Sequence, residues 1–90
     1  NGFLTVKKIE PKIDFKLYPN PANESIFVEL DPTESQNNII RIYSITGNLI
    51  QVEQAEIGIT TISVNNYAKG IYFLTVSTDK GQKTKRFVVQ

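Results

Sequence analysis

Short segments of this chain place apolar side chains at every second position. In the clearest case, Ile26, Val28 and Leu30 alternate with other residues along one run. Successive side chains of a β-strand point to opposite faces, so a period of two predicts strands with one buried face. We expect strands at residues 14–18, 25–30, 38–45, 48–55, 60–64, 70–78 and 82–89, and a weaker one at residues 4–9.

Turn-forming residues separate the predicted strands. Because glycine and asparagine tolerate positive φ, Thr46-Gly47-Asn48 and Asp79-Lys80-Gly81 are predicted to form hairpin turns. Seven or so short strands joined by turns roughly every 8–12 residues are typical of a small antiparallel β-sandwich, which is the all-β fold class we predict. Residues 1–12 carry three lysines and a proline, so we interpret them as a linker or the end of a preceding region, and residues 13–90 as the domain.

Composition supports the strand prediction and argues against catalysis. Valine, isoleucine and threonine make up 27 of the 90 residues, against 8 for alanine, leucine and methionine, and β-branched side chains favour strands. The absence of histidine and cysteine excludes thiol chemistry, Ser–His triads and most zinc sites. A chain of this size also forms only one thin core. We therefore expect no enzyme activity, no metal site and no cofactor.

The ends of the chain indicate a piece of a longer protein. It begins with asparagine, and the apolar residues 3–6 are too few for a signal peptide and precede the lysines instead of following them. No run of 18 apolar residues occurs, so we expect no membrane-spanning segment.

Three carboxylates lie close together around the loop of residues 29–34, namely Glu29, Asp31 and Glu34. Calcium binds oxygen ligands of this kind. Their spacing matches no recognised calcium loop, so a solvated acidic loop is favoured, and ion binding stays an open alternative.

Charge is distributed unevenly along the chain. Residues 69–90 carry five basic residues and one carboxylate, whereas residues 20–68 carry six carboxylates and one arginine. Lysines on an edge strand protect it from pairing with other sheets, and we favour this role over a docking role for the basic end. The cations are too few, and lack the interleaved aromatic residues, for nucleic-acid binding. An exposed edge strand also allows the isolated domain to dimerise.

Six aromatic residues provide an alternative function, a sugar-stacking platform. They are Tyr18, Phe27, Tyr43, Tyr67, Tyr72 and Phe73. Such platforms usually use tryptophan, which is absent, and anchoring of the core and turns is the commoner role of these side chains. A carbohydrate-binding or adhesive β-sandwich module is therefore kept as the alternative.

Four short motifs occur in a characteristic order. They are Tyr18-Pro19-Asn20-Pro21 with the strand of residues 25–30, residues 40–50 with Tyr43 and Gly47, residues 58–76 with Gly58, Gly70 and Tyr72, and Gly81 with the basic and apolar residues 83–89. Over residues 15–90 this set closely resembles the C-terminal sorting domain of the type IX (Por) secretion system of Bacteroidetes.

The resemblance implies that the domain is a sorting signal and not a catalyst. Such a domain follows an N-terminal cargo domain, is recognised in the periplasm by the outer-membrane translocon, and directs the cargo across the outer membrane to the cell surface or the medium. A surface sortase commonly removes it, and we expect the cleavage within residues 7–13. The family fold that the resemblance implies is an immunoglobulin-like sandwich of seven strands.

The resemblance also nominates residues. The candidates for recognition by the translocon are Gly47, Gly70, Tyr72, Lys83, Lys85, Arg86, Val88 and Val89. Tyr18, Pro19, Asn20 and Pro21 form a structural motif, in which the prolines fix φ and Asn20 is expected to cap local backbone groups. Gly47 is expected to supply a positive φ, and Gly70 to let the chain turn into the next strand. Ser44 stands where the family often has aspartate, and Tyr67 where leucine is common, so we expect a weakened turn contact at Ser44.

Overall fold

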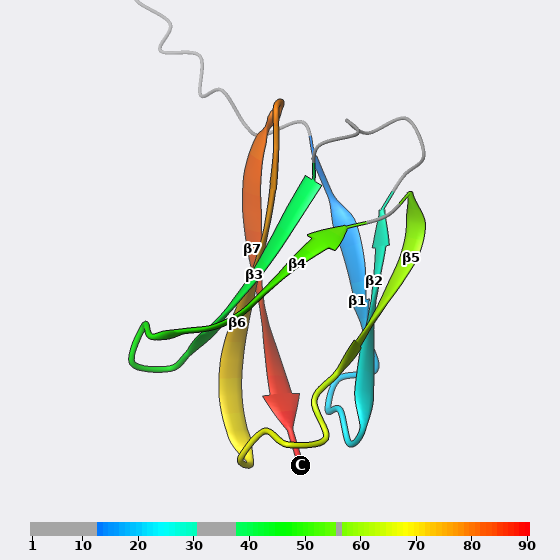
Figure 1. Ribbon diagram of the computed structural model, residues 1–90. Helices are drawn as coiled ribbons and strands as arrows, with labels where there is room; N and C mark the ends of the chain where they lie inside the picture. The colour runs from blue at the N-terminus through cyan, green and yellow to red at the C-terminus, as the bar shows by residue number, and fades with distance from the viewer. Residues whose placement is uncertain (1–12, 31–37, 56) are drawn as a thin grey trace, which may run out of the picture.

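The computed structural model describes residues 13–30, 38–55 and 57–90, which form seven β-strands and no helix (Figure 1). The strands are β1 (Phe15–Tyr18), β2 (Ser25–Leu30), β3 (Asn38–Ser44), β4 (Leu49–Ala55), β5 (Gly58–Ser63), β6 (Gly70–Thr78) and β7 (Gly81–Val89). Sheet A has the order β1-β2-β5 and sheet B the order β4-β3-β6-β7, and all these neighbours are antiparallel. This confirms the predicted fold class, an immunoglobulin-like β-sandwich.

The strand bounds agree with the predicted ones to within two residues. The largest difference is at β5, which begins at Gly58 and not at residue 60 because Gly58 and Ile59 still pair with the end of β2. The weak strand predicted at residues 4–9 lies outside the described residues, as does the proposed linker of residues 1–12.

The core lies between the two sheets and follows the period of two. In β2, the alternating Ile26, Val28 and Leu30 are buried and face the inner side of sheet B. Sheet B contributes buried side chains in the same alternation: Ile40, Ile42, Tyr72, Leu74, Val76, Phe87 and Val89. Burial of these apolar side chains is the main source of stability, because the chain has no disulfide.

The β3–β4 hairpin has an irregular register and a turn held by side chains. Gly47 has φ +91°, the positive value that was predicted, and its N–H donates to the carbonyl of Ser44 at 2.9 Å. Ser44 also accepts a hydrogen bond on Oγ from the Asn48 N–H at 3.2 Å. Serine therefore makes a turn contact at the position where a weakened one was expected. The pairing shifts between Ile42 and Tyr43, which marks a β-bulge.

The two long sides of the sandwich differ. On one side, the residues that flank β1 of sheet A contact β7 of sheet B, through a parallel bridge between Ala22 and Val89 and through ion pairs of Asp14 described below. On the other side, β4 and β5 are the outer strands of their sheets. Figure 1 shows the β3–β4 hairpin projecting away from the rest of the sandwich.

Candidate functional site

Strand β7, which carries five of the eight nominated recognition residues, is paired along one edge and is also held at the end of its other edge. One edge pairs with β6 over its whole length. Along the other, the Val88 N–H donates to Oδ1 of Asn20 at 3.0 Å, and the Val88 carbonyl accepts from the Ala22 N–H at 2.7 Å. The Gln90 N–H then donates to the Ala22 carbonyl at 2.9 Å.

These contacts give the Tyr-Pro-Asn-Pro motif a long-range role. Pro21 has no N–H and cannot donate a backbone hydrogen bond to β7. The hydrogen bonds to this edge of β7 are formed instead by the side-chain carbonyl of Asn20 and the backbone of Ala22. Asn20 was expected to cap nearby backbone groups, whereas its hydrogen bond reaches a residue 68 positions away. The motif therefore holds the last strand of the domain in place.

A second set of contacts ties β7 to the start of the domain. Oδ1 of Asp14 lies 3.1 Å from Nζ of Lys83 and 3.3 Å from Nζ of Lys85. Lys85 also donates to the carbonyl of Phe15 at 2.5 Å, with its ammonium 5.0 Å from the centre of the Phe15 ring. Hydrogen bonds from Lys83, from the Phe15 N–H and from Lys85 lower the pKa of Asp14 to about 2. We call this group the Asp14 clamp.

The clamp gives a testable pH dependence. The lowered pKa means that Asp14 stabilises the fold while ionised, so its contribution is present above pH 4 and is lost as the pH falls towards 2. The carboxylate is largely exposed, so Asp14→Asn should lower the free energy of unfolding at pH 7 by at most about 1 kcal/mol. Denaturant unfolding at pH 7 and pH 2.5 should show this difference shrinking at the lower pH. An equal difference at both pH values would contradict the clamp.

The side chain of Tyr72 is held within the domain by a hydrogen bond and by contacts with two aromatic rings. Its hydroxyl donates to the carbonyl of Ala68 at 2.6 Å, four residues upstream at the β5–β6 connection. This is the tyrosine corner of immunoglobulin-like sandwiches. The Tyr72 ring stacks on Phe87 with centroids 5.6 Å apart and contacts Tyr67 at 5.1 Å. Tyr72 thus connects the end of the sheet to β7 and is almost entirely buried.

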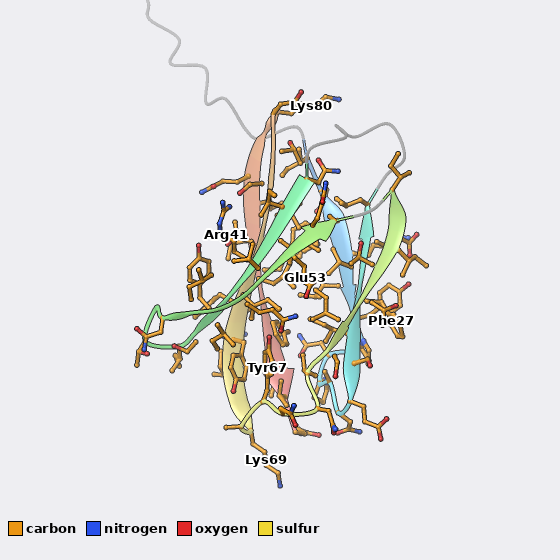
Figure 2. The ribbon with its side chains drawn as sticks, in the orientation of Figure 1. Phe27, Arg41, Glu53, Tyr67, Lys69 and Lys80 are labelled. Atoms are coloured by element: carbon orange, nitrogen blue, oxygen red, sulfur yellow. The ribbon has the colours of Figure 1, made fainter. Side chains whose placement is uncertain are left out.

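Tyr67 completes this cluster with a polar link to β4. Its hydroxyl donates to Oε1 of Gln51 at 2.5 Å, and Nε2 of Gln51 donates to Glu53 at 2.7 Å. Burial, then the nearby Tyr72 and Glu53, raises the pKa of Tyr67 to about 12. The hydroxyl is therefore neutral and able to donate at physiological pH. Figure 2 shows Glu53 and Tyr67 on the inner side of sheet B.

The structure separates the nominated residues into three environments. Tyr72 and Val89 are buried. Lys83 and Lys85 lie on the inward side of β7, in the Asp14 clamp. Those that remain reachable are Arg86 and Val88 on the outer side of β7, and Gly47 and Gly70 at the ends of strands. The eight residues therefore do not form one patch.

The aromatic residues considered for sugar stacking are also divided. Tyr67 and Tyr72 belong to the internal cluster, while Tyr18 and Phe27 form a pair on the outer side of sheet A, with centroids 5.5 Å apart. The Tyr18 hydroxyl donates to Glu29 at 3.1 Å, so this carboxylate already has a partner. Asp31 and Glu34 of the acidic loop lie outside the described residues. Among the residues that the structure describes, no group of three side chains is arranged to hold a metal ion.

Sequence reasoning did not identify Asp14 or the corner at Tyr72. A signal for Asp14 was available: it is a carboxylate directly before β1, while Lys83 and Lys85 share the face of β7 that also carries Phe87 and Val89. For Tyr72, the signal was its place near the start of a strand that follows a turn.

The geometry defines a class of small immunoglobulin-like sandwich domains in which the end of the last strand is also held by the segment that follows the first strand. Comparison with known proteins identifies the family. The secretion system C-terminal sorting domain matches residues 16–90, so the chain belongs to this family. The resemblance seen in the four motifs is thereby confirmed.

Two relatives are polysaccharide-degrading enzymes by name. Beta-agarase A of Zobellia galactanivorans is 36% identical over 72 residues, which cover 80% of this chain and 13% of the agarase. Funoran endo-beta-hydrolase of Wenyingzhuangia aestuarii is 31% identical over 74 residues, which cover 80% of this chain and 10% of that enzyme. The chain thus spans about a tenth of the length of these relatives.

Membership of this family makes the chain a sorting signal of the type IX secretion system, and a sorting tail is not a catalytic domain. The family match favours this function over the alternative of a carbohydrate-binding module. Such a tail belongs to a secreted protein, at the cell surface or outside the cell. In the described part of the chain, no helix is long and apolar enough to cross a membrane.

Proposed function

We propose that the outer-membrane translocon of the type IX system reads this domain in the periplasm, on a cargo protein that precedes it, and that a surface sortase then removes the domain. The observation that carries the proposal is the family match over residues 16–90. The short share of each relative that the chain covers supports a separate cargo portion. The cleavage zone is residues 7–13, before β1.

The contacts of β7 support recognition of a folded surface. One edge of β7 is paired with β6, the end of the other edge is hydrogen-bonded to Asn20 and Ala22, and Tyr72, Phe87 and Val89 are buried between the sheets. A partner that meets the folded domain can therefore contact the outer sides of β7, such as Arg86 and Val88, but not the inward ones. We propose that the buried members of the nominated set act by maintaining the fold, and that Arg86 and Val88 are read directly.

The experiment is a fusion of residues 1–90 to a reporter that carries its own inner-membrane signal, expressed in a bacterium with a type IX system. We expect the reporter to become accessible to external protease in intact cells. Its mass should fall by slightly less than the 10.2 kDa of the chain, because the sortase cuts after the first few residues. A reporter that stays in the periplasm would contradict recognition by the translocon, whereas a surface reporter of full length would contradict removal by the sortase.

A further inference from the structure

The outer face of sheet B combines apolar side chains with two arginines. Cross-strand pairing puts Leu49, Tyr43, Phe73 and Arg86 in one row, one residue from each strand. The next row pairs Val52 with Arg41. Since Ile40, Ile42, Tyr72 and Leu74 are buried, strand alternation turns these residues outward. We call Arg41, Tyr43, Leu49, Val52, Phe73 and Arg86 the arginine–apolar face.

Exposure on this face is high for apolar residues. Leu49 and Val52 are 53% and 51% exposed, and the adjoining Ile45 and Ile50 of the hairpin are 63% and 43% exposed. Figure 2 shows Arg41 projecting from the side of the sandwich opposite to Phe27. Contiguous exposed apolar residues of this kind mark interaction surfaces in soluble domains.

The charges of the face have one sign. The Arg41 side chain donates to Ser77 at 3.3 Å, and no hydrogen bond or ion pair joins the side chain of Arg86 to the described residues. No outward position on the described strands of sheet B carries Asp or Glu. A complementary surface would thus place carboxylates opposite two guanidinium groups and an apolar region between them.

We propose that this face docks an acidic, partly apolar protein surface of the secretion machinery; the inference rests on the proposed function and assigns the surface through which it acts. Arginine and aromatic residues are enriched in protein interfaces. Anionic lipid recognition typically uses clusters of four or more basic residues, and this face has two. A protein interface buries roughly 800 Å² on each partner, so the contact extends from the hairpin across β6 to β7.

Docking occurs on the face and not along the free edge of β4. Glu53 points inward on this edge strand, and the register shift at Ile42 and Tyr43 distorts the hairpin. Inward charges and bulges are devices that prevent an edge strand from pairing with another strand. Main-chain pairing with a second copy through β4 is therefore disfavoured, and side chains carry the contact.

The test compares two matched double variants in the reporter fusion. Leu49→Gln with Val52→Gln removes two half-exposed aliphatic side chains from the face. The control, Ile57→Gln with Ile59→Gln, removes two that are 58% and 54% exposed, one directly before β5 and one within it. We expect the face variant to reduce delivery of the reporter at least tenfold and the control less than twofold. Thermal unfolding of each purified domain checks that both variants fold.

Charge reversal gives a second arm that does not depend on the first. Arg86→Glu should also reduce delivery at least tenfold, whereas Lys69→Glu, which lies at the end of the sandwich away from the face, should leave it unchanged (Figure 2). Delivery unaffected by the face variants, with the wild type exported, would overturn the inference. Loss with Arg86→Glu alone, together with binding of the purified domain to phosphatidylglycerol vesicles, would replace the protein partner by a lipid. Failure of the wild type would contradict sorting itself.

Discussion

Replacing Phe87 with alanine should lower the free energy of unfolding of the domain by about 3–5 kcal/mol. Phe87 is fully buried and stacks on Tyr72, so the substitution removes a ring from the centre of the contact between β7 and the core. Small domains are stable by roughly 5–15 kcal/mol in total, and the loss corresponds to a fall in Tm of at least roughly 12 °C. Denaturant and thermal unfolding of the purified domain measure both quantities.

Phe27 provides the matched control for this prediction. It is also a phenylalanine in a strand, but it lies on the outer side of sheet A and is only half-buried. Phe27→Ala should therefore cost about 1 kcal/mol, since it opens no cavity between the sheets. Equal losses for the two variants would show that β7 does not complete the core as described. In the reporter fusion, we expect Phe87→Ala to reduce delivery in proportion to the unfolded fraction.

The second large effect concerns Tyr72, for which two substitutions separate the ring from the hydroxyl. Tyr72→Ala should destabilise the domain by about 3–5 kcal/mol because it removes the contacts with Tyr67 and Phe87. Tyr72→Phe keeps the ring and loses only the hydrogen bond to the Ala68 carbonyl, so it should cost about 1 kcal/mol. Unfolding curves of the two purified variants measure these differences.

Reporter delivery then distinguishes a structural role of Tyr72 from direct recognition. Since its side chain is buried, Tyr72→Phe should retain nearly normal delivery at a temperature where the variant is folded. A severe defect in delivery by a folded Tyr72→Phe domain would mean that the hydroxyl is read by the translocon. That result would contradict the assignment of Tyr72 to the tyrosine corner alone.

The strands could be predicted from the sequence because the pattern that defines each strand lies within a few consecutive residues. Ile26, Val28 and Leu30 define one buried face without reference to any other strand, and Gly47 marks a turn by its own backbone preference. The four motifs likewise identified the family, because they depend on order and spacing along the chain. Neither the strand pattern nor the four motifs require knowledge of which strands become neighbours in space.

The candidate site was less predictable because it depends on contacts between distant residues. The hydrogen bond from Val88 to Asn20 and the pairing of Lys83 and Lys85 with Asp14 each join the two ends of the domain. Sequence reasoning treated the lysines of β7 as one basic strand. Strand alternation, once the sheets are known, divides that strand into an inward side whose two lysines share the carboxylate of Asp14 and an outward side that includes Arg86.

The most direct test of sorting compares the location of one reporter in two strains. Residues 13–90 are fused to a reporter with its own inner-membrane signal, and the fraction cleaved by external protease is measured in intact cells with and without a functional type IX translocon. We expect most of the reporter to be accessible in the first strain and only a background level in the second, where it stays in the periplasm. Equal accessibility in both strains, or none in either, would contradict a role of this domain as a type IX sorting signal.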